Sequence, residues 1–367
     1  MLPVMRSASK VNGIIFCMML AGMFCYSLPA LYGFARTQDN PAPLFMDGKL
    51  VRQFEQFYDK QFFLRDPSIK LWANIQHLVF REATSGAVLG RDGWLFTSQE
   101  YRIPNAMQAN REQQVGMIVG ARDALKEQGI RLIMLPVPMK VDIYPEYRLR
   151  EPQAAVKELQ SSLEMRLHDE AVELVELYSE FREAAAGQPL FLHNDTHWSP
   201  EGAQLAAVLL ARQFPELIGQ TAFHTQGTGH REYSGDLQRY LQFDPRLRPE
   251  YFELAQLNGH ETLRQHQHID ADSLFGDIPM TIAVVGTSYT HMLEWNFPGA
   301  LKQALSQDVM VVAAEAHGPF HAMQAFQQLD TAQRAGINTV IWEFPVRTLL
   351  AQQVSRKGPT DHGERLF

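Results

Sequence analysis

The stretch TIAVVGTSYT, residues 281–290, decides the fold. Its first five residues are apolar or β-branched, as in a strand that is buried on both faces of a parallel sheet. Gly286 then permits a sharp turn, which would expose the hydroxyl of Ser288 at the carboxyl end of the strand, where open α/β sheets bind ligands. A serine in this place can act as a nucleophile, or it can be an N-cap that only opens the next helix.

Similar apolar segments lie on both sides of this stretch. We expect strands at residues 130–137, 172–177, 309–313 and 339–344, and helices at 111–128, 201–212, 297–305 and 319–328. Apolar strands that alternate with helices are typical of an α/β fold with a mostly parallel sheet covered on both faces. Residues 87–96 predict a hairpin, and residues 48–80 predict two helices joined at Asp66-Pro67. Residues 214–279 do not fit the alternation, and we expect an insertion or lid there.

The N-terminal segment is typical of an export element. Arg6 and Lys10 precede an apolar run from Val11 to Ala35, which is longer than the ~7–15-residue core of a signal peptide. We expect residues 1–36 to stay attached as a membrane anchor, with the following domain in the periplasm. A cleaved signal peptide and a soluble periplasmic domain are the alternative. The remaining boundaries that we predict are a linker at 37–44, a folded domain at 45–355 and a tail at 356–367.

Composition excludes several classes of function. The formal net charge is -8 and no run of Lys or Arg occurs, which argues against a nucleic-acid partner. The two cysteines, Cys17 and Cys25, both lie in the apolar N-terminal run. The folded domain therefore has no disulfide, no cysteine metal site and no catalytic cysteine.

A second motif, HNDTHWSPEG at residues 193–202, could supply the partners of a nucleophilic serine. Ser199 and Pro200 are typical of a helix N-cap and first turn, so Asp195 and His197 would lie in the turn before that helix. Catalysis by serine needs an imidazole that takes its proton and a carboxylate that orients the imidazole. A capping turn with a structural His–Asp hydrogen bond is the alternative.

The same motif also allows a metal site. His193, Asp195 and His197 alternate along the chain and would share one face of an extended segment, with His266 or His268 as a further ligand. This arrangement would make the protein a metallohydrolase.

Two cations follow expected strands. Arg347, in IWEFPVR at residues 341–347, could grip a sugar hydroxyl or a carbonyl, or it could form a buried pair with Glu343 that pins the last strand. Lys140 follows the strand at 130–137 and would face either the site or solvent.

Three motifs and their order resemble the exopolysaccharide O-acetyltransferases related to AlgJ and AlgX of alginate biosynthesis and WssI of cellulose acetylation. These motifs are Asp195-Thr196-His197-Trp198, Gly286-Thr287-Ser288-Tyr289 and Trp342-Glu343-Phe344-Pro345-x-Arg347, together with residues 88–96. The resemblance covers roughly residues 45–350. It implies an SGNH-hydrolase-like three-layer α/β/α domain in which the Asp–His pair precedes the serine, a rearranged order. Ser288 would then be the nucleophile, His197 the base and Asp195 its orienting acid, with no cofactor and no metal.

The resemblance further implies an acetyl-serine intermediate and several partners. These are a polysaccharide acceptor, a multi-spanning membrane acyltransferase as acetyl donor, and other exopolysaccharide secretion proteins. Trp198 and Tyr289 could stack a sugar ring or belong to the core, and Gly318 could be a second oxyanion donor or a plain turn glycine. The net charge leans towards a neutral polymer such as cellulose over polyanionic alginate. An acetylesterase with the same triad and a non-catalytic polysaccharide-binding subunit remain alternatives.

Overall fold

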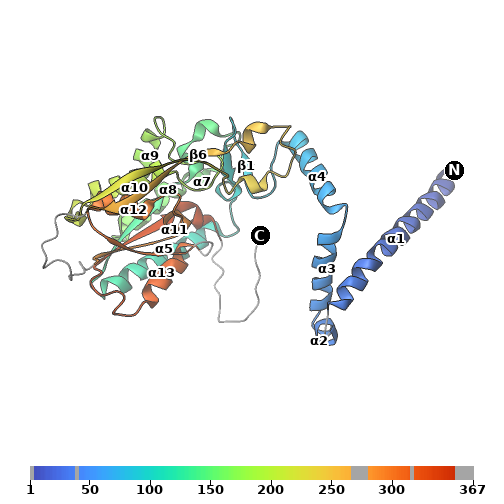
Figure 1. Ribbon diagram of the computed structural model, residues 1–367, viewed down its shortest axis with the longest axis horizontal. Helices are drawn as coiled ribbons and strands as arrows, with labels where there is room; N and C mark the ends of the chain where they lie inside the picture. The colour runs from blue at the N-terminus through green and yellow to red at the C-terminus, as the bar shows by residue number, and fades with distance from the viewer. Residues whose placement is uncertain (1–3, 38–40, 266–279, 315–317, 352–367) are drawn as a thin grey trace. The chain divides into compact units, whose positions relative to one another are not determined.

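The computed structural model describes the chain except residues 1–3, 38–40, 266–279, 315–317 and 352–367 (Figure 1). It divides into two compact units, Met1–Leu78 and Val79–Phe367. The border after residue 78 assigns the helices at 48–78 to the first unit, whereas the sequence suggested one domain from residue 45. The tail expected at 356–367 lies outside the described residues.

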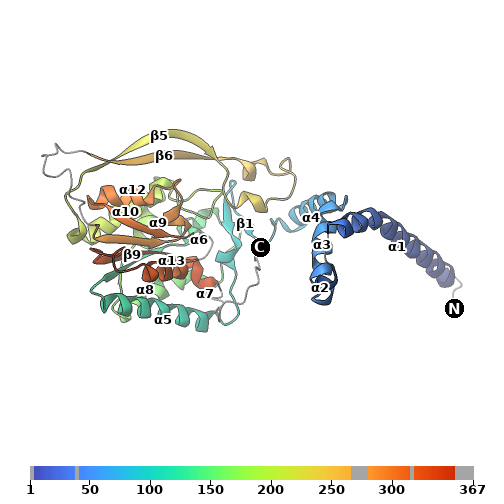
Figure 2. The same ribbon diagram turned by 60° about the horizontal axis from the view of Figure 1, so that its bottom comes forward.

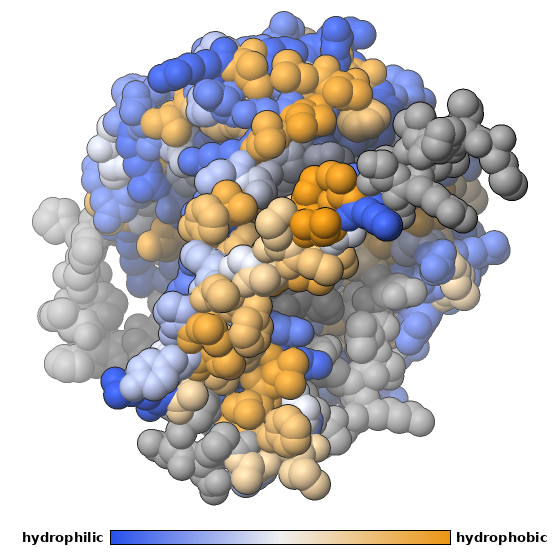
Figure 3. Space-filling model, turned by 90° about the vertical axis from the view of Figure 1, so that its right-hand side faces the viewer, coloured by the Kyte–Doolittle hydropathy of each residue, from blue (hydrophilic) through white to orange (hydrophobic). Residues whose placement is uncertain are grey.

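Four helices form the first unit: α1 (Val4–Arg36), α2 (Pro41–Met46), α3 (Lys49–Gln61) and α4 (Arg65–Phe80), whose last two residues belong to the second unit. Within α1, the stretch Lys10–Arg36 is long and apolar enough to cross a membrane, with a mean hydropathy of 2.0 and none of its most apolar window buried. Figure 3, which faces this unit, shows the band of hydrophobic side chains. Part of the expected linker 37–44 is helical, because α2 begins at Pro41.

The break between α3 and α4 lies at residues 62–64, before the predicted site at Asp66-Pro67. Pro67 instead occupies the first turn of α4, where a residue needs no N–H for a helical hydrogen bond. Within this unit, α3 contacts α1. The ring of Phe34 packs against the rings of Phe54 and Phe57, with 5.5 Å between the ring centres in each pair. The two expected helices are therefore present, but the proline begins a helix and does not end one.

A five-stranded parallel sheet forms the centre of the second unit, in the order β4-β3-β9-β7-β8. Its strands are β3 (Arg131–Val137), β4 (Glu173–Leu174), β7 (Ile282–Gly286), β8 (Val309–Ala313) and β9 (Thr339–Pro345). Alternate residues of each strand point to opposite faces. Val284 and Ile341 therefore lie in one hydrophobic core, and Val285 and Trp342 lie in the other. The predicted parallel sheet is confirmed, although β4 is shorter than residues 172–177.

Helices cover both faces of this sheet, which makes three layers (Figure 2). One core includes residues of α5 (Met107–Lys126), α8 (Leu159–Asp169) and α13 (Pro319–Gln328), and the other includes residues of α9 (Tyr178–Ala184), α10 (Pro200–Gln213) and α12 (Phe297–Leu305). Short α-helical turns are α6 (Lys140–Ile143), α7 (Ala154–Lys157) and α11 (Ser288–His291). Turns of 3₁₀ helix are η1 (Ser98–Tyr101), η2 (Pro145–Tyr147), η3 (Pro215–Leu217), η4 (Gln238–Tyr240), η5 (Pro249–Phe252) and η7 (Val346–Leu350).

Two antiparallel pairs complete the unit. The predicted hairpin is confirmed as β1 (Ala87–Leu89) and β2 (Leu95–Thr97). The expected insertion at 214–279 contains the ribbon of β5 (Phe223–Tyr233) and β6 (Ala255–Arg264), which contacts α12 and does not join the central sheet. Residues 266–279, with His266 and His268, lie outside the described residues. That this insertion is a lid remains a prediction.

Candidate active site

The serine of the β7 motif lies where the strand ends and α11 begins. Thr287 is the N-cap residue of α11, and Ser288 is its partly exposed first residue. A Cβ on Gly286 would lie 2.2 Å from Thr290 Oγ1 and 2.6 Å from Glu343 Oε2. Gly286 is therefore required by this close approach, and not by the left-handed turn conformation, which it does not adopt.

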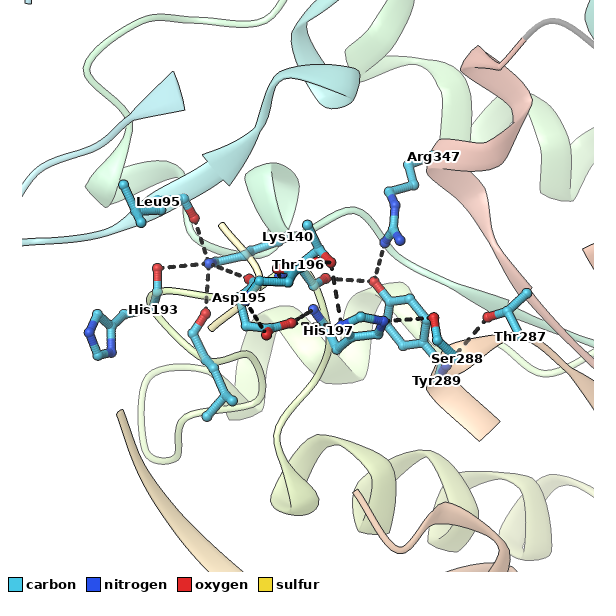
Figure 4. A network of polar contacts seen from close by, with 12 residues as sticks. Leu95, Lys140, His193, Asp195, Thr196, His197, Thr287, Ser288, Tyr289 and Arg347 are labelled. Carbon is cyan, nitrogen blue, oxygen red and sulfur yellow. Dashed lines mark hydrogen bonds and ion pairs between the residues drawn. The ribbon is translucent and has the colours of Figure 1, made fainter. Parts of the chain in front are cut away.

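Ser288, His197 and Asp195 form one chain of hydrogen bonds (Figure 4). His197 Nε2 lies 2.7 Å from Ser288 Oγ, and His197 Nδ1 lies 2.6 Å from Asp195 Oδ1. Ionised Asp195 can only accept hydrogen bonds, so Nδ1 carries the proton and Nε2 is free to take the one from the serine. The helix start predicted beside this pair is confirmed, because Ser199 caps α10 by accepting the N–H of Gly202 at 3.0 Å.

The carboxylate of Asp195 is buried and fully engaged. Oδ1 also accepts the backbone N–H of His197, and Oδ2 accepts that of Asp236, each at 2.8 Å. Burial alone would raise the pKa of Asp195, but the hydrogen bonds from His197 and Asp236 outweigh it and hold the pKa below its usual value. Asp195 therefore stays ionised beside the imidazole.

Asp236 is a site residue that the sequence analysis missed. Its Oδ1 accepts the N–H of Thr196 at 2.8 Å and its Oδ2 accepts the Thr196 hydroxyl at 2.6 Å. Burial, and then the charge of Asp195, raise the pKa of Asp236. The preceding Gly235 lies so close to Asn194 that a Cβ there would meet its carbonyl oxygen at 2.1 Å. The adjacent Gly235 and Asp236 in the insertion were the sequence feature that could have indicated this site residue.

Lys140 lies neither in the site nor in solvent, the two positions that the sequence left open. Its side chain is buried, and its three N–H groups are shared among the carbonyl oxygens of Leu95, Leu192, His193 and Asp195, which lie 2.6, 2.6, 3.0 and 2.9 Å from Nζ. Burial lowers the pKa of Lys140 to about 7, against the charges of Glu100 and Asp195. The ammonium therefore fixes the backbone of the loop that carries Asp195 and His197 (Figure 4).

Replacing Lys140 by methionine is expected to lower kcat by about 100-fold and to lower the melting temperature, because each buried carbonyl left without a donor costs about 1–3 kcal/mol. Steady-state kinetics below the melting temperature checks this, with the exposed Lys126→Met as control. Wild-type kcat in folded Lys140→Met protein would contradict the positioning role.

Glu343 and Arg347, for which the sequence left a buried pair open, share no hydrogen bond or ion pair within the described part of the chain, although the charge of Arg347 opposes the rise that burial causes in the pKa of Glu343. Glu343 accepts the N–H of Thr287 at 2.6 Å and the hydroxyl of Thr290 at 3.0 Å, so it holds the turn that presents the serine. Burial raises the pKa of Glu343, and these hydrogen bonds oppose the rise. Arg347 instead donates to the hydroxyl of Tyr289 and lies 5.1 Å from the centre of its ring.

Trp198 and Tyr289, the aromatic residues that could have stacked a sugar ring, are buried in the core. Tyr289 is 2% exposed and donates its hydroxyl to the carbonyl of Thr196 at 2.6 Å. Trp198 is 0% exposed and packs against Tyr289 and Phe297. The ring beside the imidazole is that of Trp295, which stacks on His197 at 5.4 Å. Sequence alone did not single out Trp295.

Gly318 lies just before α13, with a φ of 76° that favours glycine. Residues 315–317, which precede it, lie outside the described residues. The role of Gly318 as an oxyanion donor stays a prediction.

His193 does not lie where the alternative metal site would need it as a ligand. His193 contributes its backbone carbonyl to Lys140, and its ring points away from the triad (Figure 4). In the part of the chain that the structure describes, the possible ligand groups that lie within 4.8 Å of one another are those of Asp195, His197 and Asp236. Both oxygens of both carboxylates already accept hydrogen bonds, so a metal ion would have to displace them.

Removal of divalent metal ions with EDTA is accordingly expected to leave acetyl-ester turnover unchanged, because Ser288, His197 and Asp195 need no ion for proton transfer. Turnover before and after dialysis against EDTA measures this. A large loss that zinc restores would favour the metallohydrolase.

A serine, histidine and aspartate joined by hydrogen bonds in a three-layer α/β/α unit form the site of a serine hydrolase-like protein. Residues 87–346 match the family model of the SGNH hydrolase-like domain of acetyltransferase AlgX, and the chain belongs to this family.

Relatives with curated names support the same assignment. The chain is 34% identical over 344 residues to a probable alginate O-acetylase AlgJ of Pseudomonas aeruginosa, covering 90% of this chain and 87% of that protein. It is 33% identical over 354 residues to the AlgJ of Pseudomonas putida, covering 94% and 90%. The solved O-acetyltransferase domain of P. putida AlgJ superposes with a TM-score of 0.66 at 31% identity, covering 75% of this chain and 96% of that one. AlgX of P. aeruginosa shares the fold, with a TM-score of 0.56 at 19% identity over 79% of this chain and 72% of that one.

Proposed function

We propose that this protein is an exopolysaccharide O-acetyltransferase that carries the acetyl group on Ser288 between donor and polymer. The proposal is based on two consecutive hydrogen bonds. One joins Ser288 Oγ to His197 Nε2 at 2.7 Å, and the other joins His197 Nδ1 to Asp195 Oδ1 at 2.6 Å. Membership of the AlgX acetyltransferase family supports acetyl transfer as the reaction.

In the first step, Ser288 Oγ attacks the carbonyl carbon of the acetyl donor while His197 Nε2 takes the hydroxyl proton. The tetrahedral intermediate expels the donor's alcohol or thiol group, which leaves with the proton from His197, and acetyl-serine remains. Asp195 stabilises the imidazolium and stays ionised throughout.

In the second step, a polymer hydroxyl gives its proton to His197 and attacks the acetyl carbon. Collapse of this intermediate returns the proton to Ser288 and releases the acetylated polymer. Among the described residues no oxygen accepts the Ser288 N–H, so it is available to the oxyanion, and Gly318 N–H is the second donor that we propose.

The acceptor polymer that we propose is of the alginate type. The relatives reported above are named as probable alginate O-acetylases, whereas the cellulose acetylation implied by the resemblance to WssI is not among the names reported above. A multi-spanning acyltransferase would supply the acetyl group, and other secretion proteins would present the polymer.

Transfer and hydrolysis share these residues, so one assay separates the transferase from the acetylesterase. The protein is incubated with an activated acetyl ester, with and without alginate oligosaccharides, and the products are analysed. A transferase yields acetylated sugar at the expense of free acetate. Acetate alone at all acceptor concentrations would favour the esterase, and no turnover would favour the non-catalytic binding subunit.

The apolar stretch Lys10–Arg36 is expected to remain attached and to hold the catalytic unit at the periplasmic face of the inner membrane, because about 20 apolar residues span a bilayer. N-terminal sequencing of the protein from the membrane fraction checks this. A soluble protein that starts near Arg36 would show a cleaved signal peptide.

A further inference from the structure

Two adjoining cavities open beside the β1–β2 hairpin of the second unit. Their volumes are about 420 Å³ and about 240 Å³. Both are lined by Arg81, Leu89 and Leu149. We call the two cavities together the arginine groove.

Five arginines line the arginine groove: Arg81, Arg91, Arg102, Arg150 and Arg248. Only two acidic side chains, Glu82 and Asp92, line it with them. This local excess of positive charge is opposite in sign to the net charge of the chain, -8. The groove therefore attracts anions, although the protein as a whole repels them.

Most of these guanidinium groups are not neutralised by the protein. Arg248 pairs with Glu250, but within the described ranges no carboxylate forms an ion pair with the other four. Arg91 and Arg102 each donate to one backbone carbonyl, at 3.3 and 2.8 Å. Each keeps further N–H groups that can bind a carboxylate.

The walls between the arginines are apolar. Val88, Leu89 and Leu149 line the groove together with Tyr101, whose ring is covered by the guanidinium of Arg150 at 5.3 Å. Apolar walls beside a few charged groups suit a ligand with apolar faces and carboxylates at intervals. A chain of uronic acid sugars has both features.

The hairpin joins the arginine groove to the loop of the triad. Leu89, in the groove wall, pairs with Leu95 of the second strand. The N–H of Leu95 donates a hydrogen bond to the carbonyl oxygen of His193 at 2.8 Å. Its carbonyl oxygen accepts a hydrogen bond from the ammonium of Lys140 at 2.6 Å. The β1–β2 hairpin therefore lies between the groove wall and the loop that carries Asp195 and His197.

We propose that the arginine groove is a subsite that holds the carboxylate groups of an acidic polysaccharide, across the β1–β2 hairpin from the loop of the triad. The inference rests on the proposed function and adds a site to it. It also reverses the expectation, drawn from the net charge, of a neutral polymer, because the charge in the groove outweighs the distant charges that salt screens.

The double variant Arg81→Gln/Arg150→Gln of the full-length protein tests the subsite. Both residues are exposed, and within the described ranges neither forms a hydrogen bond or an ion pair with the triad loop. Transfer from an activated acetyl ester is measured to alginate oligosaccharides and to cello-oligosaccharides of equal length, which lack carboxylates. The KM for the alginate acceptor is expected to rise about tenfold, and to rise with salt in the wild type. The KM for the neutral acceptor and the hydrolysis of the ester should not change.

Arg212→Gln is the matched control, because Arg212 is an exposed arginine of α10 that lines neither cavity. If the double variant had an unchanged KM for alginate, the arginine groove would not be a subsite. The proposed function would still hold in that case, provided that the protein hydrolysed the ester and transferred its acetyl group. If the wild-type protein did not turn over the ester at all, the proposed function would be wrong. Binding of both proteins to phosphatidylglycerol vesicles is measured as well. If the double variant bound these vesicles less than the wild type while its KM for alginate stayed the same, the groove would bind lipid and the proposal would be wrong.

Discussion

Replacing Ser288 by alanine is expected to lower kcat for acetyl transfer on the order of 10⁵-fold, as is typical when the nucleophile of a serine triad is removed. The change deletes the atom that forms the acetyl bond and leaves His197 Nε2 without its partner at 2.7 Å. The fold should persist, because a partly exposed hydroxyl at the start of α11 contributes little packing.

Steady-state kinetics with an activated acetyl ester, together with thermal melting, measures both parts of this expectation. Ser161→Ala, an exposed serine of α8, is the control and should behave as wild type. Substantial turnover by folded Ser288→Ala protein would remove the serine from the mechanism and with it the triad.

Replacing Asp195 by asparagine is expected to lower kcat by about 10⁴-fold with the fold retained. Asp195 accepts three N–H groups, from the ring and backbone of His197 and from the backbone of Asp236. An asparagine has one oxygen, so its amide NH₂ must face either the imidazole or another N–H. Facing the imidazole, it favours the tautomer whose Nε2 already carries a proton and cannot accept that of Ser288.

The matched control is Asp169→Asn, an exposed carboxylate at the end of α8. The kcat of both variants with the same ester decides the matter. If Asp195→Asn kept more than about a tenth of the wild-type kcat, orientation of His197 by the carboxylate would not be part of the mechanism.

The sheet could be predicted from the sequence because its strands are continuous apolar runs, such as residues 281–285 and 339–344. The helix start at Ser199-Pro200 was predictable for a similar local reason, since the cap and the proline are adjacent. These local signals placed Asp195 and His197 in one turn. They also placed Ser288 at a strand end.

Residues that act through distant contacts could not be predicted in the same way. Lys140 reaches four carbonyls more than 40 positions away along the chain, and no local pattern shows such a contact. Asp236 lies in an insertion without strand or helix periodicity. For Trp198 and Tyr289 the sequence left two readings open, because an aromatic side chain suits both a core and a sugar platform, and only burial distinguishes the two.

The most direct test of the account is mass spectrometry of the full-length protein during turnover. After rapid mixing with an activated acetyl ester, the peptide that contains Ser288 should carry one acetyl group. Added alginate oligosaccharides should then remove that group at the rate at which acetylated sugar forms. An unmodified Ser288 during sustained transfer, or an acetyl group on another residue that turns over at this rate, would contradict the acetyl-serine mechanism.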